Sequence, residues 1–240
     1  MNRVNSHSIL SSFLALAGAS FILAGCAATS GFTYKDFKVS KGNAEAGTGK
    51  TVVFGSSHLQ LEGTPIKMGD TLRDAKLTTM PPGFKLVSLT EGKGKVRIVS
   101  IVPSLDTKVC EQQTHYLSEK NRGLDRDVQL ITVSVDTPFA QKRFAEESNI
   151  RNVTFLSDYR GGDFGRAHGL LVPDLHLLAR SVMVVDKDNV VRYLQVVPEL
   201  ASMPDMERAF EEARKVAGLP PPASSMSSAI GSMGGGYGGY

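Results

Sequence analysis

Two adjoining runs organise this chain: Val96-Arg-Ile-Val-Ser-Ile-Val102 and Pro103-Ser-Leu-Asp-Thr-Lys-Val-Cys110. The first run is almost continuously apolar, which is typical of a strand buried on both faces of a sheet. From Cys110 to about Asn121 the residues favour a helix, and Gly123 provides a stop signal. A cysteine at such a strand-to-helix turn meets the free amides of the helix N-terminus, which favour its thiolate form. Cys110 is therefore the candidate nucleophile.

The segments around this junction alternate between strand-like and helix-like patterns. Period-two alternation predicts strands, apolar residues at helical spacing predict helices, and Gly, Pro, Asn and Asp mark the turns. In chain order the expected elements span 51–54, 58–62, 84–89, 96–102, 110–121, 128–135, 139–148, 153–156, 164–170, 181–185, 190–196 and 203–217. This order predicts an α/β protein, a thioredoxin-like three-layer α/β/α sandwich with a mixed sheet and an N-terminal β-hairpin.

Composition divides the 240 residues into four parts. Residues 1–25 combine a short, weakly charged start with an apolar run, as in a secretory signal. Residues 26–50 are polar and are expected to form a flexible tether, and residues 51–218 form the folded domain. Residues 219–240 are rich in Pro, Ser and Gly and contain no charged residue, which predicts a disordered tail. Acidic and basic residues balance in the domain, which argues against nucleic acid binding.

Cys26 ends the run Leu23-Ala-Gly-Cys26, which resembles the bacterial lipobox. The resemblance implies that Cys26 is lipidated and becomes the first mature residue, so that the domain is anchored outside the cytoplasm on the periplasmic side of a membrane. Ala27 rather than Asp follows, which favours the outer membrane. The alternative is an ordinary signal peptide cut after a small residue such as Gly25 or Ala27. With Cys26 modified, Cys110 is the one free thiol left in a chain with two cysteines.

The spacing Pro103-x3-Thr107-x2-Cys110 resembles the active-site pattern of the peroxiredoxin family, and the longer run from Pro103 resembles its thiol peroxidase branch. Further matches at 134–144 and 179–186 extend the resemblance across about 51–218. The family implies a thioredoxin-like fold and thiol-dependent reduction of hydrogen peroxide or organic hydroperoxides. It requires no cofactor, and the scattered histidines show no metal-ligand spacing.

Three residues support Cys110 in this interpretation. Thr107 precedes it by three positions, so its hydroxyl can turn toward the sulfur across the first helical turn, although it could also cap the helix. Pro103 shields the site and fixes the entry into the loop. The resemblance assigns Arg180 as the guanidinium that bonds sulfur and peroxide.

One departure changes the expected cycle. Most members of the branch have a resolving cysteine in the helix after the 128–135 strand, where this chain has Ala145. The sulfenic acid of Cys110 is then resolved by an external thiol, from a thioredoxin-like protein or a small molecule. The resemblance also implies a homodimer. The alternative function is a thioredoxin-like binding or scaffold lipoprotein whose redox site has decayed.

Overall fold

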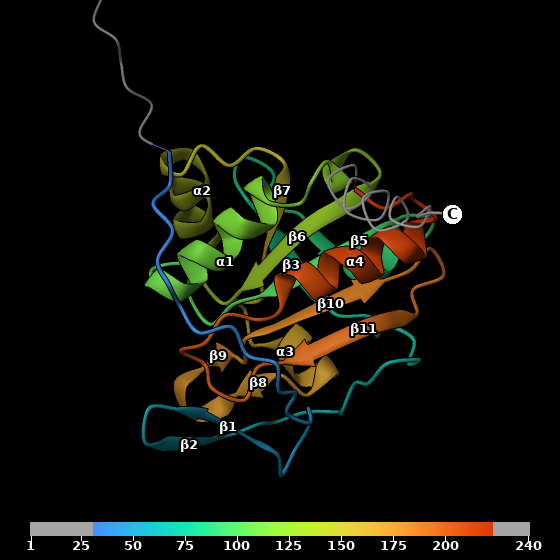
Figure 1. Cartoon of the computed structure of the whole chain (residues 1–240). Helices are drawn as coiled ribbons and strands as arrows, with labels where there is room; N and C mark the ends of the chain where they lie inside the picture. The colour runs from blue at the N-terminus through green and yellow to red at the C-terminus, as the bar shows by residue number, and fades with distance from the viewer. Residues whose placement is uncertain (1–30, 223–240) are drawn as a thin grey trace, which may run out of the picture. The chain divides into compact units, whose positions relative to one another are not determined.

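The computed structural model describes residues 31–222. Its centre is a seven-stranded sheet in the order β11-β10-β5-β6-β7-β3-β4 (Figure 1). Strands β5, β6 and β7 run parallel, and each of the other pairings is antiparallel, so the sheet is mixed as predicted. The strands span Lys76–Thr79 (β3), Leu86–Ser88 (β4), Val96–Ile101 (β5), Val128–Ser134 (β6), Val153–Ser157 (β7), Ser181–Val185 (β10) and Val191–Val196 (β11).

Side chains alternate between the two faces of this sheet and build two hydrophobic clusters. Ile98 of β5 belongs to one cluster, and its neighbour Val99 belongs to the other. Residues of α1 (Lys108–Glu119), α2 (Pro138–Glu147) and α4 (Met206–Ala217) join the first cluster. The second cluster is covered by α3 (Asp163–His168) with the hairpins β1–β2 (Thr51–Phe54, Ser57–Gln60) and β8–β9 (Leu171–Val172, Leu177–Leu178). The predicted three-layer thioredoxin-like architecture is confirmed.

Several boundaries differ from the sequence prediction for local reasons. Helix α4 begins at Met206 rather than at 203, because the Asp205 side chain accepts a hydrogen bond from the Arg208 amide and caps the helix. Strand β3 and the two-residue strands β8 and β9 were not predicted, since each is too short for its pattern to stand out. The structure also has 3₁₀ helices over Leu89–Gly92, Leu124–Arg126 and Pro173–Leu175.

The prediction of a flexible tether is wrong for residues 32–50. Residues 32–41, here called the strap, run beside α1 as the blue segment of Figure 1 and contact the domain along their length. The Ser40 amide donates to the Met203 carbonyl at 2.8 Å, and farther along Ala46 is 5% exposed in the core. The prediction rested on polar composition, whereas aromatic residues between the polar ones supply the apolar surface that the segment buries. The compact unit therefore begins at Phe32 rather than at 51.

The expected signal peptide over 1–25, the lipidation site Cys26 and most of the expected tail lie outside the described residues. Of the tail, residues 219–222 are described, and they follow the left-handed C-cap Gly218 at the end of α4. Among residues 31–222, no helix combines the length and the apolar character needed to cross a membrane.

His168 is a buried histidine whose hydrogen bonds fix its tautomer. Its Nδ1 lies 2.8 Å from the Phe164 carbonyl, and its Nε2 accepts from the Arg73 amide at 3.2 Å. The ring therefore donates from Nδ1 and is neutral. Burial lowers the pKa of His168 from 6.5 to about 4, with Arg73 adding to the effect and the bond to Phe164 opposing it. Protonation would remove the acceptor that holds the chain before β3.

We expect His168→Gln to remove part of the acid sensitivity of the fold. Because the folded-state pKa of His168 lies below its ordinary value, the unfolded chain takes up this proton first as pH falls from 6.5 to 4, and stability is lost over that window. Between neutral pH and pH 4 the free energy of unfolding should fall by about 3 kcal/mol more in the wild type than in the variant, at about 1.4 kcal/mol per pH unit. Urea unfolding at several pH values measures the difference.

The matched control is His58→Gln, since His58 lies exposed on β2. Its pH profile should follow that of the wild type. Parallel profiles for the wild type and His168→Gln would contradict the prediction.

Candidate active site

Cys110 lies in the first turn of α1, the helix that follows the central strand β5 in the chain. The loop 102–107 carries the chain from the end of β5 into the helix, whose N-cap residue is Thr107. Helix α1 begins at Lys108, two residues earlier than predicted, so the amide of Cys110 is among the free donors at the helix start. The Cys110 side chain points inward and is 0% exposed. The thiol is therefore enclosed by protein while its helix begins at the surface.

Thr107 directs its side chain to the sulfur rather than to the helix. It makes no side-chain cap hydrogen bond, and its Oγ1 lies 2.9 Å from Cys110 Sγ. The same hydroxyl is 3.2 Å from the Ser104 carbonyl, and its single hydrogen can serve one acceptor at a time. Because Thr107 itself is exposed, it forms the boundary between solvent and the enclosed thiol.

Arg180 reaches the sulfur from the other side. It lies between β9 and β10, is 2% exposed, and places its Nη2 3.3 Å from Cys110 Sγ. Its Nη1 donates to Gln113 Oε1 at 2.7 Å, and its Nε donates to the Leu200 carbonyl at 2.8 Å. The partners that orient the guanidinium are thus neutral oxygens. A thiolate at Cys110 would supply the negative charge that a buried guanidinium requires.

Gln113 holds Arg180 in place and was missed by the sequence analysis. Its side chain is fully buried, accepts from Arg180, and donates from Nε2 to Ser100 Oγ of β5 at 2.8 Å. Position 113 follows Cys110 by three residues and so faces the same side of α1. That spacing was the available signal, but it could not indicate what the amide contacts.

Asp136, at the end of β6, holds the loop before Cys110. Its carboxylate accepts from Ser104 Oγ and from the Leu105 amide, both at 2.8 Å. Pro103 is buried at the start of this loop. The loop is therefore fixed by side-chain bonds to the neighbouring parallel strand as well as by proline.

The structure brings Cys110, Thr107 and Arg180 together, while none of the histidines among residues 31–222 bonds to the sulfur. His115 faces the strap, with its ring centroid 3.9 Å from that of Phe32, and its Nδ1 pairs with Glu119. Within residues 31–222, no group of three His, Cys, Asp or Glu side chains could hold a metal ion. Ala145 lies in α2, 8% exposed, in the same hydrophobic cluster as Cys110.

Comparison with known proteins identifies the family of this chain. The family model described as Redoxin matches residues 67–210. A thiol peroxidase from Halalkalibacterium halodurans is 39% identical over 164 residues, which cover 68% of this chain and 97% of the relative. A thiol peroxidase from Listeria innocua is 41% identical over 164 residues, covering 68% of this chain and 98% of the relative.

Solved structures give the same result for the fold. A peroxiredoxin-like protein from Aquifex aeolicus matches with a TM-score of 0.65 and 34% identity, over 73% of this chain and 99% of the other. A thiol peroxidase from Chromobacterium violaceum has a TM-score of 0.59 over 69% of this chain and 97% of its own, and at 23% identity it supports the fold alone. With the cysteine, threonine and arginine converging on one sulfur, the chain belongs to the thiol peroxidase branch of the peroxiredoxin family.

Proposed function

We propose that this protein reduces peroxides through Cys110 as its single peroxidatic cysteine, and that an external thiol completes each cycle. The observation on which this rests is the position of Cys110 Sγ between the Thr107 hydroxyl and the Arg180 guanidinium. A decayed binding protein has no need to keep a buried cation directed at a thiol, because an uncompensated buried charge is strongly destabilising.

The first step oxidises the sulfur by two electrons. The Cys110 thiolate attacks one peroxide oxygen, the S–O bond forms, the O–O bond breaks, and the other oxygen leaves as hydroxide or alkoxide and takes up a proton. Arg180 stabilises the thiolate and the negative charge that develops on the leaving oxygen, as preorganised donors do in other active sites. Thr107 donates its hydroxyl hydrogen at the solvent side of the same atoms.

The second step reduces the sulfenic acid with a thiol from another molecule. That thiol displaces water from Cys110 and forms a mixed disulfide, which a second thiol reduces to release Cys110. Ala145 supports this proposal, because an alanine cannot serve as the resolving residue. Without an external thiol, excess peroxide should drive Cys110 to the sulfinic acid.

Removal of either donor should slow the oxidation of Cys110. Arg180→Met deletes the cation and Thr107→Val deletes the hydroxyl, and each should lower the second-order rate with hydrogen peroxide by about 10²- to 10³-fold. Stopped-flow measurement with the reduced protein, followed by mass analysis of Cys110, gives the rate. Thr107→Ser should retain most of it, because the hydroxyl remains.

Arg192→Met is the matched control for lost charge, since Arg192 is half exposed and pairs with Asp186. It should react as the wild type does. Equal rates for Arg180→Met and Arg192→Met would show that the guanidinium at the sulfur has no part in the reaction.

Placing a cysteine at position 145 should convert the external cycle into an internal one. After one equivalent of peroxide, Ala145→Cys should form an intrachain disulfide with Cys110, provided that the first turn of α1 unwinds. Non-reducing mass analysis detects it. Glu146→Cys is the control, because Glu146 is 64% exposed and lies on the other side of α2. A wild-type dimer linked through Cys110 of two subunits would instead show that the partner subunit resolves the sulfenic acid.

We also propose that the mature protein is anchored outside the cytoplasm through lipid on Cys26, on the periplasmic side and at the outer membrane. The lipobox-like run before Cys26 supports this.

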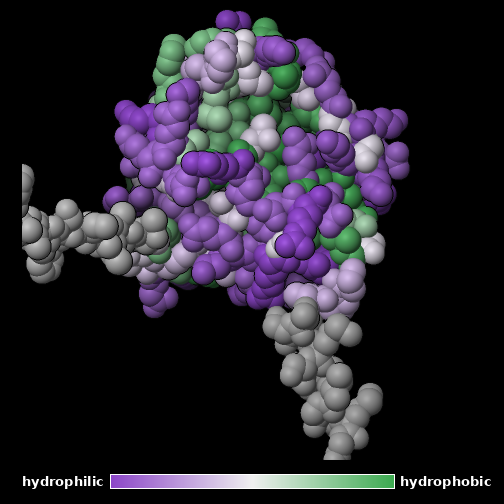
Figure 2. Space-filling model, turned by 90° about the horizontal axis from the view of Figure 1, so that it is seen from above, coloured by the Kyte–Doolittle hydropathy of each residue, from purple (hydrophilic) through white to green (hydrophobic). Residues whose placement is uncertain are grey.

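A homodimer is part of the proposal as well. Figure 2 shows a face on which hydrophilic residues leave hydrophobic areas between them. The exposed rings of Phe84 and Phe139 lie 5.2 Å apart and provide apolar surface for a second copy.

Mass analysis of the mature N-terminus tests the anchor. We expect the chain to begin at Cys26 with attached lipid and to fractionate with membranes, because acyl chains bury many methylene groups in the bilayer. Cys26→Ser should lose the lipid and leave the membrane fraction. A mature chain that begins at another residue, or an unmodified Cys26, would refute the proposal.

A further inference from the structure

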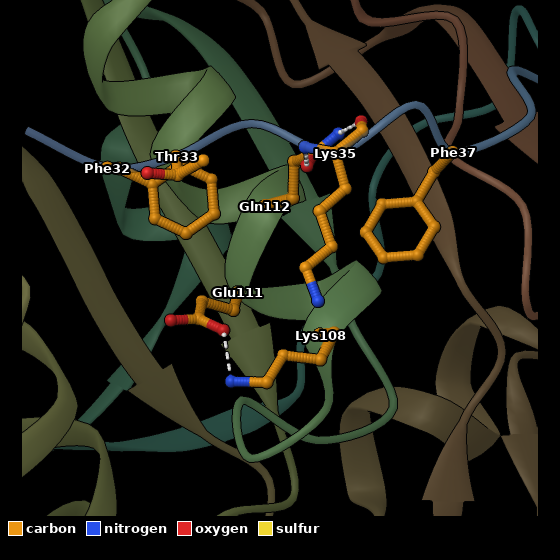
Figure 3. A pocket seen from close by; sticks show the side chains of 7 residues that line it. All are labelled: Phe32, Thr33, Lys35, Phe37, Lys108, Glu111 and Gln112. Atoms are coloured by element: carbon orange, nitrogen blue, oxygen red, sulfur yellow. Dashed lines mark hydrogen bonds and ion pairs between the residues drawn. The ribbon is translucent and has the colours of Figure 1, made fainter.

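The strap and α1 exchange two hydrogen bonds at Gln112, two residues after Cys110. The Lys35 amide donates to Gln112 Oε1 at 2.6 Å, and Gln112 Nε2 donates back to the Lys35 carbonyl at 2.9 Å (Figure 3). Gln112 is 5% exposed, and its neighbour in the chain is Gln113, which orients Arg180. Its amide therefore pairs with the backbone of the strap much as a neighbouring strand would.

The strap is tied down on both sides of this pair. Before it, the Phe32 ring stacks on His115, and the Tyr34 hydroxyl donates to Glu119 at 2.8 Å. After it, Lys38 and Ser40 exchange backbone hydrogen bonds with Met203, both at 2.8 Å. The middle of the strap cannot leave α1 unless the Lys35–Gln112 bonds break.

Packing alone does not hold the strap against the first turns of α1. A cavity of about 240 Å³ lies between them, lined by Phe32, Thr33, Lys35, Phe37, Lys108, Glu111 and Gln112. In Figure 3 the Phe32 and Phe37 rings flank the Lys35 side chain, and Lys108 pairs with Glu111 at the helix. The two hydrogen bonds thus make the specific connection at this point.

An external thiol has to reach a sulfur that is 0% exposed. Hydrogen peroxide is far smaller than glutathione or a protein thiol, and the larger thiol needs Cys110 to turn outward. In an α-helix the amides of residues 112–114 bond to the carbonyls of 108–110, so this turn must open through Gln112. The Thr114 hydroxyl also donates to the Cys110 carbonyl at 2.9 Å and closes the same turn.

We propose that Gln112 and the strap form a clamp that keeps the first turns of α1 closed, and so limits how fast an external thiol resolves oxidised Cys110. Gln112 is a positioning residue, since it acts through the helix and does not touch the sulfur. In the closed state Cys110 remains beside Arg180 and reacts with peroxide. In the open state its sulfenic acid meets the thiol, the S–S bond forms and water leaves. The consequence for turnover rests on the proposed function, whereas the clamp itself does not.

One side of the clamp, the strap, lies outside the residues that the family model matches. The Redoxin match begins at residue 67, and the thiol peroxidase of H. halodurans is aligned over 97% of its own length by 68% of this chain. The strap precedes the match and contacts a helix within it.

Three variants separate the clamp from general packing. Gln112→Ala removes both bonds from the α1 side, and Lys35→Pro removes the amide donor from the strap side. Lys35→Ala is the matched control, because it changes the same residue but keeps the backbone groups. All are made in the full chain, and urea unfolding confirms that each is folded at the assay temperature.

The first readout is alkylation of reduced Cys110 by a bulky maleimide, followed by mass analysis of the Cys110 peptide. Loss of the bonds should favour the open state. We expect roughly tenfold faster alkylation in Gln112→Ala and Lys35→Pro, with Lys35→Ala and the wild type alike. The double variant should be no faster than the faster single variant, since both break one connection. Unchanged alkylation in both single variants would overturn the clamp.

The second readout follows the two half-reactions. The rate of Cys110 oxidation by hydrogen peroxide should stay within about twofold of the wild type in Gln112→Ala. Reduction of the sulfenic acid by glutathione should be roughly tenfold faster, and the yield of sulfinic acid under excess peroxide correspondingly lower. Equal losses in both half-reactions would show that Gln112 merely supports the fold and would overturn the clamp. If wild-type Cys110 does not react with peroxide, the proposed function fails, while the alkylation result still judges the clamp.

Discussion

The arrangement of this protein depends on a buried cation that faces a buried sulfur. The guanidinium of Arg180 is orientated by the Gln113 amide and the Leu200 carbonyl, and its remaining nitrogen lies 3.3 Å from Cys110 Sγ. Both partners that orient it are uncharged, so the sulfur is the group that can balance it. A charge taken out of water is tolerated only where it is paired and hydrogen-bonded. The same geometry places a cation beside the sulfur that we propose as the nucleophile.

The antiparallel pairing of β5 with β10 brings Arg180 close to Cys110. Ser181 of β10 is the Cα partner of Ile101 in β5, so the residue before one strand lies beside the end of the other. Arg180 precedes β10 and the Cys110 loop follows β5, and their side chains meet at that edge. A third strand contributes through Asp136, which follows β6 and accepts hydrogen bonds from the Cys110 loop. Three strands therefore position the nucleophile, and the first turn of α1 presents it.

The strap holds the first turns of α1 closed, whereas an external reductant requires these turns to open. A closed helix keeps Cys110 Sγ beside Arg180, while a partner thiol would require the same helix to open. The Lys35–Gln112 bonds bias this balance toward the closed state without touching the reacting atoms.

The sequence by itself determined the candidate nucleophile and most of the succession of elements. A continuous apolar strand, a turn and a helix start are local patterns, and they located Cys110 and Thr107 without any long-range contact. Arg180 came from a resemblance, because nothing local distinguishes one arginine from another. The tertiary structure alone showed Gln113 as its support and the strap as part of the fold. Lys35 and Gln112 lie 77 positions apart, and their bonds depend on surfaces that exist only after the domain has folded. Polar composition predicted a free tether because composition reports how much apolar surface a segment has. It does not report whether the folded domain offers a surface that the segment can bind.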